Sequence, residues 1–187
     1  MIHNGIDYPY IQKILLSEEQ INSIVTRIAA DIDRDYADKR LVLVSILKGS
    51  VMFTAALMGK LKTNAEIEFM KVSSYGSQTK STGCISVLLD LKREDLEQLD
   101  LLIVEDIVDS GRTLNLLTGL LRERGAKSVK TVTLLDKPAR REVPFTPDYT
   151  GAEIPDEFVV GFGLDYNEKY RNLPYVGILH PDVYTNK

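Results

Sequence analysis

Apolar and polar residues follow two different patterns along the chain. In residues 17–32 the apolar positions recur every three or four residues, which predicts an amphipathic helix, and Ser17 with Gln20 fits a capping box at its start. Shorter apolar-rich runs instead predict strands: 41–47, 67–72, 84–89, 99–106 and 128–136. The run at 41–47 is continuous, as expected of a strand that is covered on both faces.

Further helices are expected between these strands, over residues 50–61 and 113–125. Gly125 is placed to end the second of them. A succession of strand, helix and strand implies right-handed crossovers and a mostly parallel sheet. The sequence therefore predicts an α/β fold with a mostly parallel central sheet flanked by helices.

The last fifty or so residues have a different character. They are irregular and rich in Pro and Tyr, with two short apolar runs at 157–166 and 174–179. The sequence contains no internal repeat and no Ser/Gly/Pro linker, so we expect a single domain over 1–187. Its core is expected at about 35–137. The N-terminal residues and about 138–187 are expected to form a small hood subdomain over one end of the sheet.

Length and composition restrict the class of protein. A chain of 187 residues with 44% hydrophobic residues can bury one full core. The net charge of -4 argues against a general nucleic-acid or membrane-surface binder. The start of the chain has no apolar signal core, and no apolar stretch approaches the ~18 residues of a membrane span, so a cytoplasmic protein is expected. Cys84 is the only cysteine, which leaves no disulfide framework, and we expect it to be a small buried hydrophobe.

Candidate chemistry is concentrated in residues 101–114, "LLIVEDIVDSGRTL". An apolar run ends in two acids, Glu105 and Asp106, and a small polar cluster then precedes the predicted helix: Asp109, Ser110, Gly111, Arg112 and Thr113. Ligands of an open parallel sheet bind at the carboxyl ends of its strands. The free N–H groups of a helix start, with a glycine and two hydroxyls, are suited to a phosphate.

The two acids suit a different group, because carboxylates repel phosphate but bind vicinal hydroxyls and Mg²⁺. A phosphate cradle one short step from diol-binding acids matches ribose 5-phosphate. Asp109 lies between the two sets, where it would stand near the anomeric carbon. Each residue alone also fits an ordinary acidic turn before a helix, but the combination favours a binding site.

These residues resemble a known family. "VEDIVDSGRT" is similar to the phosphoribosyl pyrophosphate motif of type I phosphoribosyltransferases, and the chain from about 10 to 180 resembles the hypoxanthine–guanine phosphoribosyltransferases. The resemblance includes "SILKGS", "SSYGSQTKSTG", "LLDKPARR" and "FVVGFGLDYNEKYRNLP", in family order. It implies the type I phosphoribosyltransferase fold. It also implies transfer of the phosphoribosyl group from phosphoribosyl pyrophosphate to N9 of hypoxanthine or guanine, with release of pyrophosphate.

The resemblance also implies roles for particular residues. Lys48, Gly49 and Arg171 match pyrophosphate-binding positions, and in the family the loop at Lys48 often contains a non-proline cis peptide before the lysine. The purine-binding positions are matched by Lys137, Phe158, Val159 and Asp165. Lys137 would donate to the exocyclic oxygen of the base, and Phe158 would stack on the purine. Taken alone, however, a solvated lysine and a core phenylalanine are the commoner interpretations.

Three further expectations concern metal, lid and proton transfer. Mg²⁺ is the implied cofactor, held by Glu105, Asp106 and Asp165. Residues 73–83 form either a surface loop or a lid over the ligand; the resemblance favours the lid, with Ser74 and Tyr75 reaching in. Asp109 is the candidate general base toward N7 of the purine, or alternatively a group that stabilises positive charge in the transition state.

Other functions find less support in the sequence. The chain has no P-loop motif, and neither His3 nor His180 has a catalytic context. A regulator that senses the same ligand usually carries a DNA- or RNA-binding surface, and the chain has no basic stripe. The expected partners are therefore phosphoribosyl pyrophosphate, a 6-oxopurine and further copies of the chain, as a homodimer or homotetramer, without nucleic acid or membrane.

Overall fold

The computed structural model describes residues 2–3, 6–74 and 85–185. Its centre is a six-stranded sheet in the order β6-β5-β4-β7-β8-β9. These strands are β4 (Leu41–Ile46), β5 (Glu66–Ser74), β6 (Ile85–Leu89), β7 (Asp100–Val108), β8 (Ser128–Asp136) and β9 (Tyr149–Glu153). All neighbouring pairs are parallel except β5–β6, so β6 is an antiparallel edge strand. The predicted mostly parallel sheet is confirmed.

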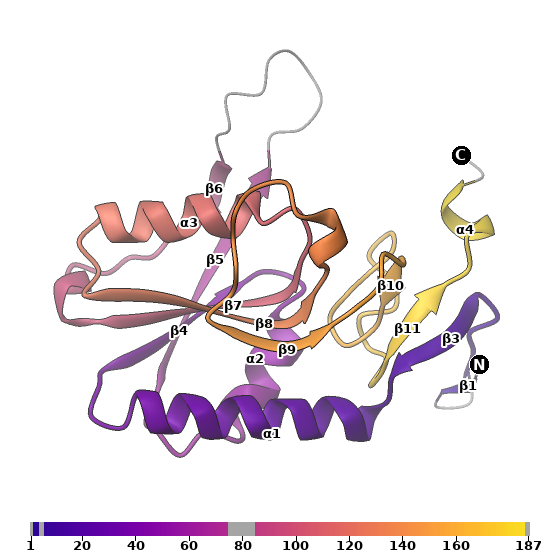
Figure 1. The fold of residues 1–187 in the computed structure, drawn as a ribbon, viewed down its shortest axis with the longest axis horizontal. Coiled ribbons are helices and arrows are strands. Elements are labelled where there is room, and N and C mark those ends of the chain that lie inside the picture. The colour runs from indigo at the N-terminus through magenta and orange to yellow at the C-terminus, as the bar shows by residue number, and fades with distance from the viewer. Residues whose placement is uncertain (1, 4–5, 75–84, 186–187) are drawn as a thin grey trace, which may run out of the picture.

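Helices cover both faces of this sheet (Figure 1). They are α1 (Glu18–Asp35), α2 (Val51–Met58) and α3 (Arg112–Glu123). Leu41 and Leu43 of β4 pack with α1 and α2 in one buried cluster, whereas Val42 and Val44 pack with α3 in the other. Side chains alternate between the faces of a strand, so the continuous apolar run of β4 supplies both clusters.

The capping box predicted at the start of the first helix is present. The Ser17 hydroxyl accepts from the backbone N–H of Gln20, and the Gln20 side chain accepts from the backbone N–H of Ser17 at 2.8 Å. The helix then buries one stripe against the sheet, made by Ile21, Val25 and Ile28. Local chemistry and burial therefore agree on where α1 begins.

A second, smaller sheet forms at one end of the molecule (Figure 1). It contains β3 (Ile11–Leu16), β10 (Val159–Val160) and β11 (Val176–Leu179), in the order β10-β11-β3, all antiparallel. The hairpin of β1 (Ile2–His3) and β2 (Ile6–Asp7) and the short helix α4 (Asp182–Thr185) lie beside it. Chain segments from both termini thus meet over the carboxyl ends of the main strands. We call this second sheet, together with the segments that lead into and join its strands, the hood.

Some element boundaries differ from the sequence predictions. The helix expected over 50–61 ends at Met58, and Leu47 lies outside β4 because the chain turns there. Residues 149–153 form β9, the edge strand of the main sheet, inside the range expected to belong to the hood. The boundary between core and hood stays a prediction. Cys84 lies outside the described residues.

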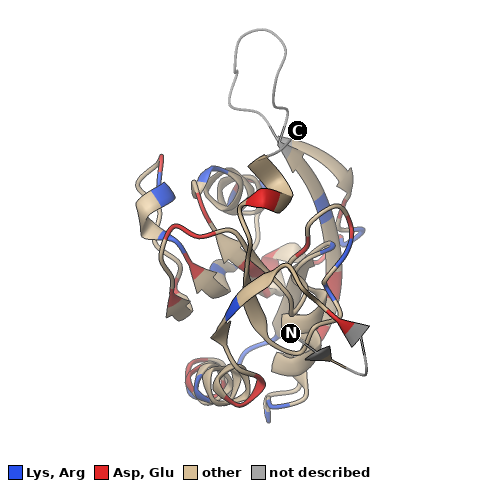
Figure 2. Ribbon diagram, turned by 90° about the vertical axis from the view of Figure 1, so that its right-hand side faces the viewer, with Lys and Arg blue, Asp and Glu red and all other residues tan. Residues whose placement is uncertain are grey.

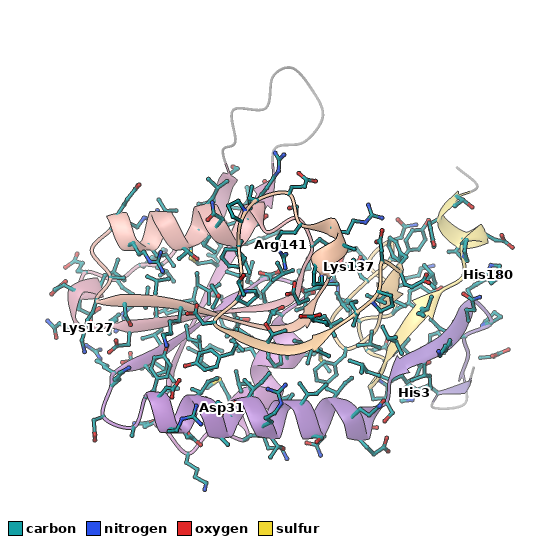
Figure 3. All side chains as sticks on the ribbon, viewed as in Figure 1. His3, Asp31, Lys127, Lys137, Arg141 and His180 are labelled. Atoms are coloured by element: carbon teal, nitrogen blue, oxygen red, sulfur yellow. The ribbon has the colours of Figure 1, made fainter. Side chains whose placement is uncertain are left out.

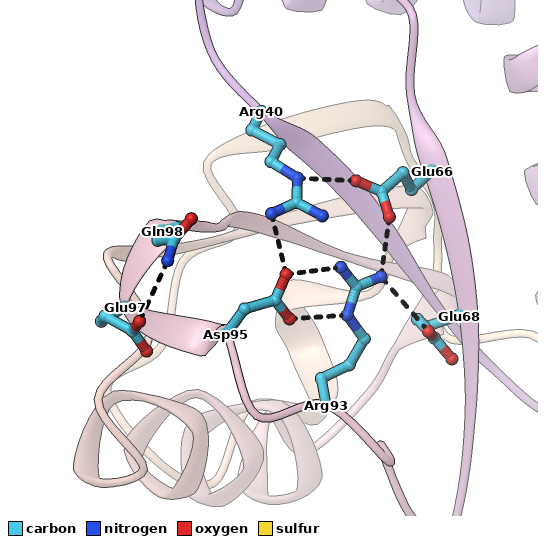
Figure 4. A network of polar contacts seen from close by, with 7 residues as sticks. All are labelled: Arg40, Glu66, Glu68, Arg93, Asp95, Glu97 and Gln98. Carbon is cyan, nitrogen blue, oxygen red and sulfur yellow. Dashed lines mark hydrogen bonds and ion pairs between the residues drawn. The ribbon is translucent and has the colours of Figure 1, made fainter.

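A network of ion pairs lies at the amino ends of β4 and β5 and joins them to the segment before β7 (Figure 4). Arg93 contacts Glu66 at 2.7 Å, Glu68 at 3.5 Å and Asp95 at 3.0 Å. Arg40 contacts Glu66 and Asp95, at 2.9 and 2.8 Å. The hydrogen bond from Arg93 is the largest influence that lowers the pKa of Asp95 to about 2. The network ties the segment before the short 3₁₀ helix η1 (Leu96–Gln98) to the start of β5.

Acidic and basic residues are interspersed over the ribbon in the view of Figure 2. The charge at any one site is therefore set by its immediate neighbours and not by a single acidic or basic segment. Of the helices in the described ranges, none combines the length and the apolar character needed to cross a bilayer.

Candidate active site

The carboxyl end of β7 places the two predicted acids at the base of a cavity of about 360 Å³. Burial is the main cause that raises the pKa of Glu105 well above its usual range, and the charge of Asp106 adds to it. Burial also raises the pKa of Asp106. The Oε2 atom of Glu105 is buried without a hydrogen-bond partner among the described residues. A bound cation or hydroxyl groups would therefore stabilise these two desolvated carboxyl groups and could contact Oε2 of Glu105.

The turn after β7 opens into the same cavity. Gly111 has φ 78° and stands at the N-cap of α3, so the chain turns through a conformation that favours glycine. Ser110 Oγ accepts from the backbone N–H of Arg112 at 3.3 Å. Asp109, Ser110, Gly111 and Thr113 line the cavity. The exposed Arg112 side chain instead pairs with Glu142 at 2.5 Å. The structure therefore brings together the predicted cradle residues except for the Arg112 guanidinium.

The loop after β4 forms a second wall of this cavity. The peptide bond between Leu47 and Lys48 is cis, as the resemblance implied. Gly49 packs so closely on Asp106 that a Cβ at this position would overlap the carboxylate. The loop and the acidic end of β7 are thus in direct contact, and any larger residue at Gly49 would displace one of them.

The two basic residues among those that line this cavity, Lys48 and Arg171, already have acidic partners. Lys48 Nζ lies 3.0 Å from Glu168 Oε2, and Arg171 Nη2 lies 3.3 Å from the same oxygen. Arg171 also contacts Asp165 at 2.8 Å and donates to the carbonyl of Gly163 at 2.7 Å. The hydrogen bond from Lys48 and then that from Arg171 lower the pKa of Glu168. One carboxylate oxygen therefore lies between the two predicted pyrophosphate-binding cations.

A second cavity, of about 630 Å³, lies beside the first. Lys137 is buried in its wall, where Nζ donates to the carbonyl of Glu157 at 2.9 Å and lies 3.5 Å from Asp109 Oδ1. Phe158 and Val159 also line this cavity, and Phe158 is 37% exposed. Five residues line both cavities: Asp106, Ile107, Asp109, Ser110 and Asp165. Asp109 thus stands where the two cavities join.

Arg141 holds this junction from outside the cavities. Its guanidinium pairs with the carboxylate of Asp136 at the end of β8 and donates to the carbonyl of Asp109 at 2.7 Å. A Cβ added at Gly111 would lie 3.0 Å from Arg141 Cδ. Figure 3 shows Arg141 and Lys137 toward the hood end of the sheet, with Lys127 at the other end. Arg141 therefore fixes the ends of β7 and β8 relative to each other.

The lid prediction falls partly outside the structure. Ser74 is the last residue of β5, and Tyr75 and the rest of 75–84 lie outside the described residues. The predicted metal ligands are only partly assembled: within the described ranges no three His, Cys, Asp or Glu side chains form a group that could hold a metal ion. Both Asp165 oxygens have protein partners, Arg171 and the backbone N–H of Glu168.

Comparison with known proteins assigns the site to a family. The sequence profile described as "Phosphoribosyl transferase domain" matches residues 12–167. The chain belongs to the phosphoribosyltransferase family. The curated hypoxanthine-guanine phosphoribosyltransferase of Staphylococcus aureus strain N315 is 49% identical over 176 residues, which cover 94% of this chain and 98% of that protein.

Solved structures of this phosphoribosyltransferase family have the same fold. A hypoxanthine phosphoribosyltransferase from Staphylococcus aureus has a TM-score of 0.90 at 48% identity and covers 95% of this chain and 96% of that chain. The hypoxanthine phosphoribosyl transferase of Trypanosoma cruzi has a TM-score of 0.90 at 43% identity, with 96% and 97% covered. The type I phosphoribosyltransferase fold expected from the sequence is confirmed, and so is the resemblance to the hypoxanthine–guanine branch.

Sequence reasoning missed three residues of this phosphoribosyltransferase site. Arg141 and its neighbour Arg140 are indistinguishable in "KPARR", although only Arg141 turns inward. Glu168 carries a negative charge, which does not indicate an anion site, and only its contacts with Lys48 and Arg171 place it at this cavity. Tyr184 lines the second cavity from α4, far along the chain from the motifs. Its only sequence signal is an aromatic residue in a polar C-terminal segment.

Proposed function

We propose that this protein transfers the 5-phosphoribosyl group from phosphoribosyl pyrophosphate to N9 of a 6-oxopurine, hypoxanthine or guanine, and so serves purine salvage. The observation that carries the proposal is the pair of joined cavities: one has an acid pair and a helix-start cradle, the other a buried lysine and a half-exposed phenylalanine. Asp109 stands at the junction, where the anomeric carbon of the sugar would lie.

The first cavity is the proposed site of the sugar diphosphate. The backbone N–H groups at the start of α3, with Ser110, Gly111 and Thr113, bind the 5′-phosphate, because the first N–H groups of a helix have no partners within it. The Arg112 backbone contributes, while its side chain stays with Glu142. Glu105 and Asp106 face the ribose hydroxyls. Lys48, the backbone of Gly49 and Arg171 bind the pyrophosphate after their shared partner Glu168 gives way.

The second cavity is the proposed purine site. The face of Phe158 stacks on the base, and backbone groups of Val159 meet the base edge. Lys137 Nζ donates to the exocyclic oxygen of the purine. A 6-amino group would place a donor against this donor, so adenine should be rejected. Asp165 closes the same cavity from the hood.

In the reaction the bond from N9 of the base to C1′ forms and the bond from C1′ to the pyrophosphate oxygen breaks, with its electron pair leaving on pyrophosphate. The base must lose one proton, and Asp109 accepts it from N7. Lys137 Nζ lies 3.5 Å from Asp109 Oδ1, so the proposed proton acceptor lies beside the proposed donor to the purine oxygen. An alternative is that Asp109 mainly stabilises positive charge as the bond to pyrophosphate breaks.

The residues present fit Mg²⁺ as the implied cofactor. Mg²⁺ prefers oxygen ligands and is usually held in proteins by one or two carboxylates together with substrate phosphates. The buried Oε2 of Glu105 has no partner among the described residues, so Glu105 and Asp106 would hold the ion, and Asp165 would do so after release from Arg171. When bound, the ion would neutralise charge on the diphosphate.

We also infer a homo-oligomer, a dimer or tetramer. Ile67 and Phe69 of β5 pair in register with Leu43 and Ser45, so they face the side of the sheet that carries α2, yet both are exposed. Met52 of α2 is exposed as well. Uncovered apolar side chains on one face favour a contact between copies. Light scattering behind size exclusion should give a multiple of 21.0 kDa, and Phe69→Asp should lower it.

The reaction itself is tested by stoichiometry. Phosphorus NMR of the protein with phosphoribosyl pyrophosphate, Mg²⁺ and hypoxanthine should show one pyrophosphate and one nucleoside monophosphate per base consumed. In the control without the base, phosphoribosyl pyrophosphate should not be turned over. Binding of phosphoribosyl pyrophosphate without any product from folded protein would instead favour a sensor.

A further inference from the structure

The second cavity contains an aromatic stack in which only Phe158 has a role in the proposed function. The rings of Phe158 and Tyr184 lie with their centroids 4.9 Å apart and their planes 24° apart. Tyr166 meets the Phe158 ring nearly at right angles, at 5.7 Å and 85°. Phe158 comes from the segment before β10 and Tyr184 from α4, so the C-terminal helix reaches into the wall of the purine site.

The stack leaves part of the Phe158 ring free. Tyr184 covers one face of the ring and Tyr166 is perpendicular to it, yet 37% of Phe158 is exposed and lines the cavity. An isolated exposed phenylalanine can rotate about two side-chain torsions, and ordering it costs conformational entropy when a ligand binds. A ring already held from one face loses less freedom when a base stacks on the other.

Hydrogen bonds fix Tyr184 relative to Phe158. The backbone N–H of Leu179 donates to the carbonyl of Phe158 at 2.8 Å, which joins β11 to the segment that carries the ring. The N–H of His180 donates to the carbonyl of Tyr10, and the hydroxyl of Tyr166 donates to the carbonyl of Val183, both at 2.8 Å. The chain is therefore tied to the hood just before α4, at His180, and inside α4, at the residue before Tyr184.

We propose that Tyr184 is a positioning residue for the purine: it holds the plane of Phe158 from one face, so that the base completes a three-layer stack on the other face. The inference rests on the proposed function and deepens it. Aromatic pairs contribute ~0.5–1.5 kcal/mol beyond their buried area. Loss of the ring should therefore raise the KM for the base by about 2- to 12-fold. The KM for phosphoribosyl pyrophosphate, which binds in the first cavity, should stay unchanged.

The test compares variants of the full-length protein in a steady-state assay with hypoxanthine as the base. Tyr184→Ala and Tyr184→Leu should both raise the KM for hypoxanthine, because leucine restores apolar volume without a flat ring. Tyr184→Phe should restore the wild-type value. Tyr10→Ala is the matched control: it removes an exposed tyrosine ring of the same hood, which lines neither cavity and whose carbonyl still accepts from His180.

Each outcome decides the question. The inference is supported if Tyr184→Ala and Tyr184→Leu raise the KM for hypoxanthine but not the KM for phosphoribosyl pyrophosphate. Tyr184→Phe and Tyr10→Ala should then keep the wild-type KM for hypoxanthine. Unchanged base KM in both variants, or equal rises in both substrate KM values, would overturn it. A wild-type protein without turnover on any base would instead overturn the proposed function, and with it the role of Tyr184. If Tyr184→Ala does not fold, the KM values of Tyr184→Leu decide between these outcomes.

Discussion

Arg141→Met should destabilise the protein far more than its position in an irregular segment suggests. Asp136 and the guanidinium of Arg141 form an ion pair in which the two side chains are only 9% and 16% exposed. Removal of one partner leaves a buried carboxylate without a counter-ion, which costs ~3–5 kcal/mol in comparable cases. At this chain length 1 kcal/mol corresponds to about 2–4 °C in Tm, so a decrease of about 6–20 °C is expected.

The neighbouring residue supplies the control. Arg140 forms an ion pair with Asp156 at 2.7 Å, but the two side chains are 62% and 42% exposed. Exposed pairs contribute about 0–1 kcal/mol, so Arg140→Met should lower Tm by no more than about 4 °C. Arg141→Met with Asp136→Asn should recover part of the lost stability, because the unpaired charge is then absent.

Thermal unfolding followed by circular dichroism measures these differences, and urea titration gives the free energy of unfolding directly. Activity should fall as well, since Arg141 also donates to the carbonyl of Asp109. Equal Tm values for the two single variants would contradict a stabilising role of the buried Asp136–Arg141 pair. So would a double variant that is less stable than Arg141→Met, because the cost would then not come from the unpaired Asp136.

Four further outcomes are expected. Asp109→Asn should lower kcat by about 10²–10⁴ if Asp109 accepts the proton, and a decrease under about tenfold would favour charge stabilisation instead. Lys137→Met should reduce the preference for hypoxanthine over adenine, measured as the ratio of kcat/KM values, by at least about tenfold; an unchanged ratio would contradict the role of Lys137. Glu168→Gln should lower the KM for phosphoribosyl pyrophosphate by up to about 5-fold, because a weak, exposed ion pair no longer competes with the ligand; a higher KM would contradict this expectation. A chelator should abolish turnover without changing the far-ultraviolet circular dichroism, and excess Mg²⁺ should restore it; full activity in the chelator would exclude the acid pair as a required metal site.

Apolar periodicity predicted the main elements because burial determines them. The run at 128–136 became β8 with the same bounds, since its residues are covered on both faces. The capping box at Ser17 is local chemistry and needs no tertiary context. In contrast, β9 could not be predicted: its sequence "YTGAE" has little apolar character, and it is a strand because the edge of β8 offers backbone partners.

The residues of the site likewise fall into those that the sequence predicts and those that only the tertiary structure places there. Residues next to one another in sequence, from Glu105 to Thr113, were predicted together because one turn positions them all. Arg141 and Glu168 act through contacts with distant residues, and nothing local distinguishes Arg141 from Arg140. Tyr184 depends on the packing of α4 against the hood. Such contacts are set by tertiary structure, which periodicity and motifs do not encode.

The measurement that tests the central claim most directly is a base panel. The protein is mixed with phosphoribosyl pyrophosphate and Mg²⁺, and hypoxanthine, guanine, xanthine, adenine or uracil is added in turn while nucleotide formation is followed by chromatography. We expect nucleotide from hypoxanthine or guanine and none from adenine or uracil, because the proposed role of Lys137 is to donate to an oxygen at the 6-position. Turnover of adenine or uracil in preference to the 6-oxopurines, or none with any base from folded protein, would contradict it.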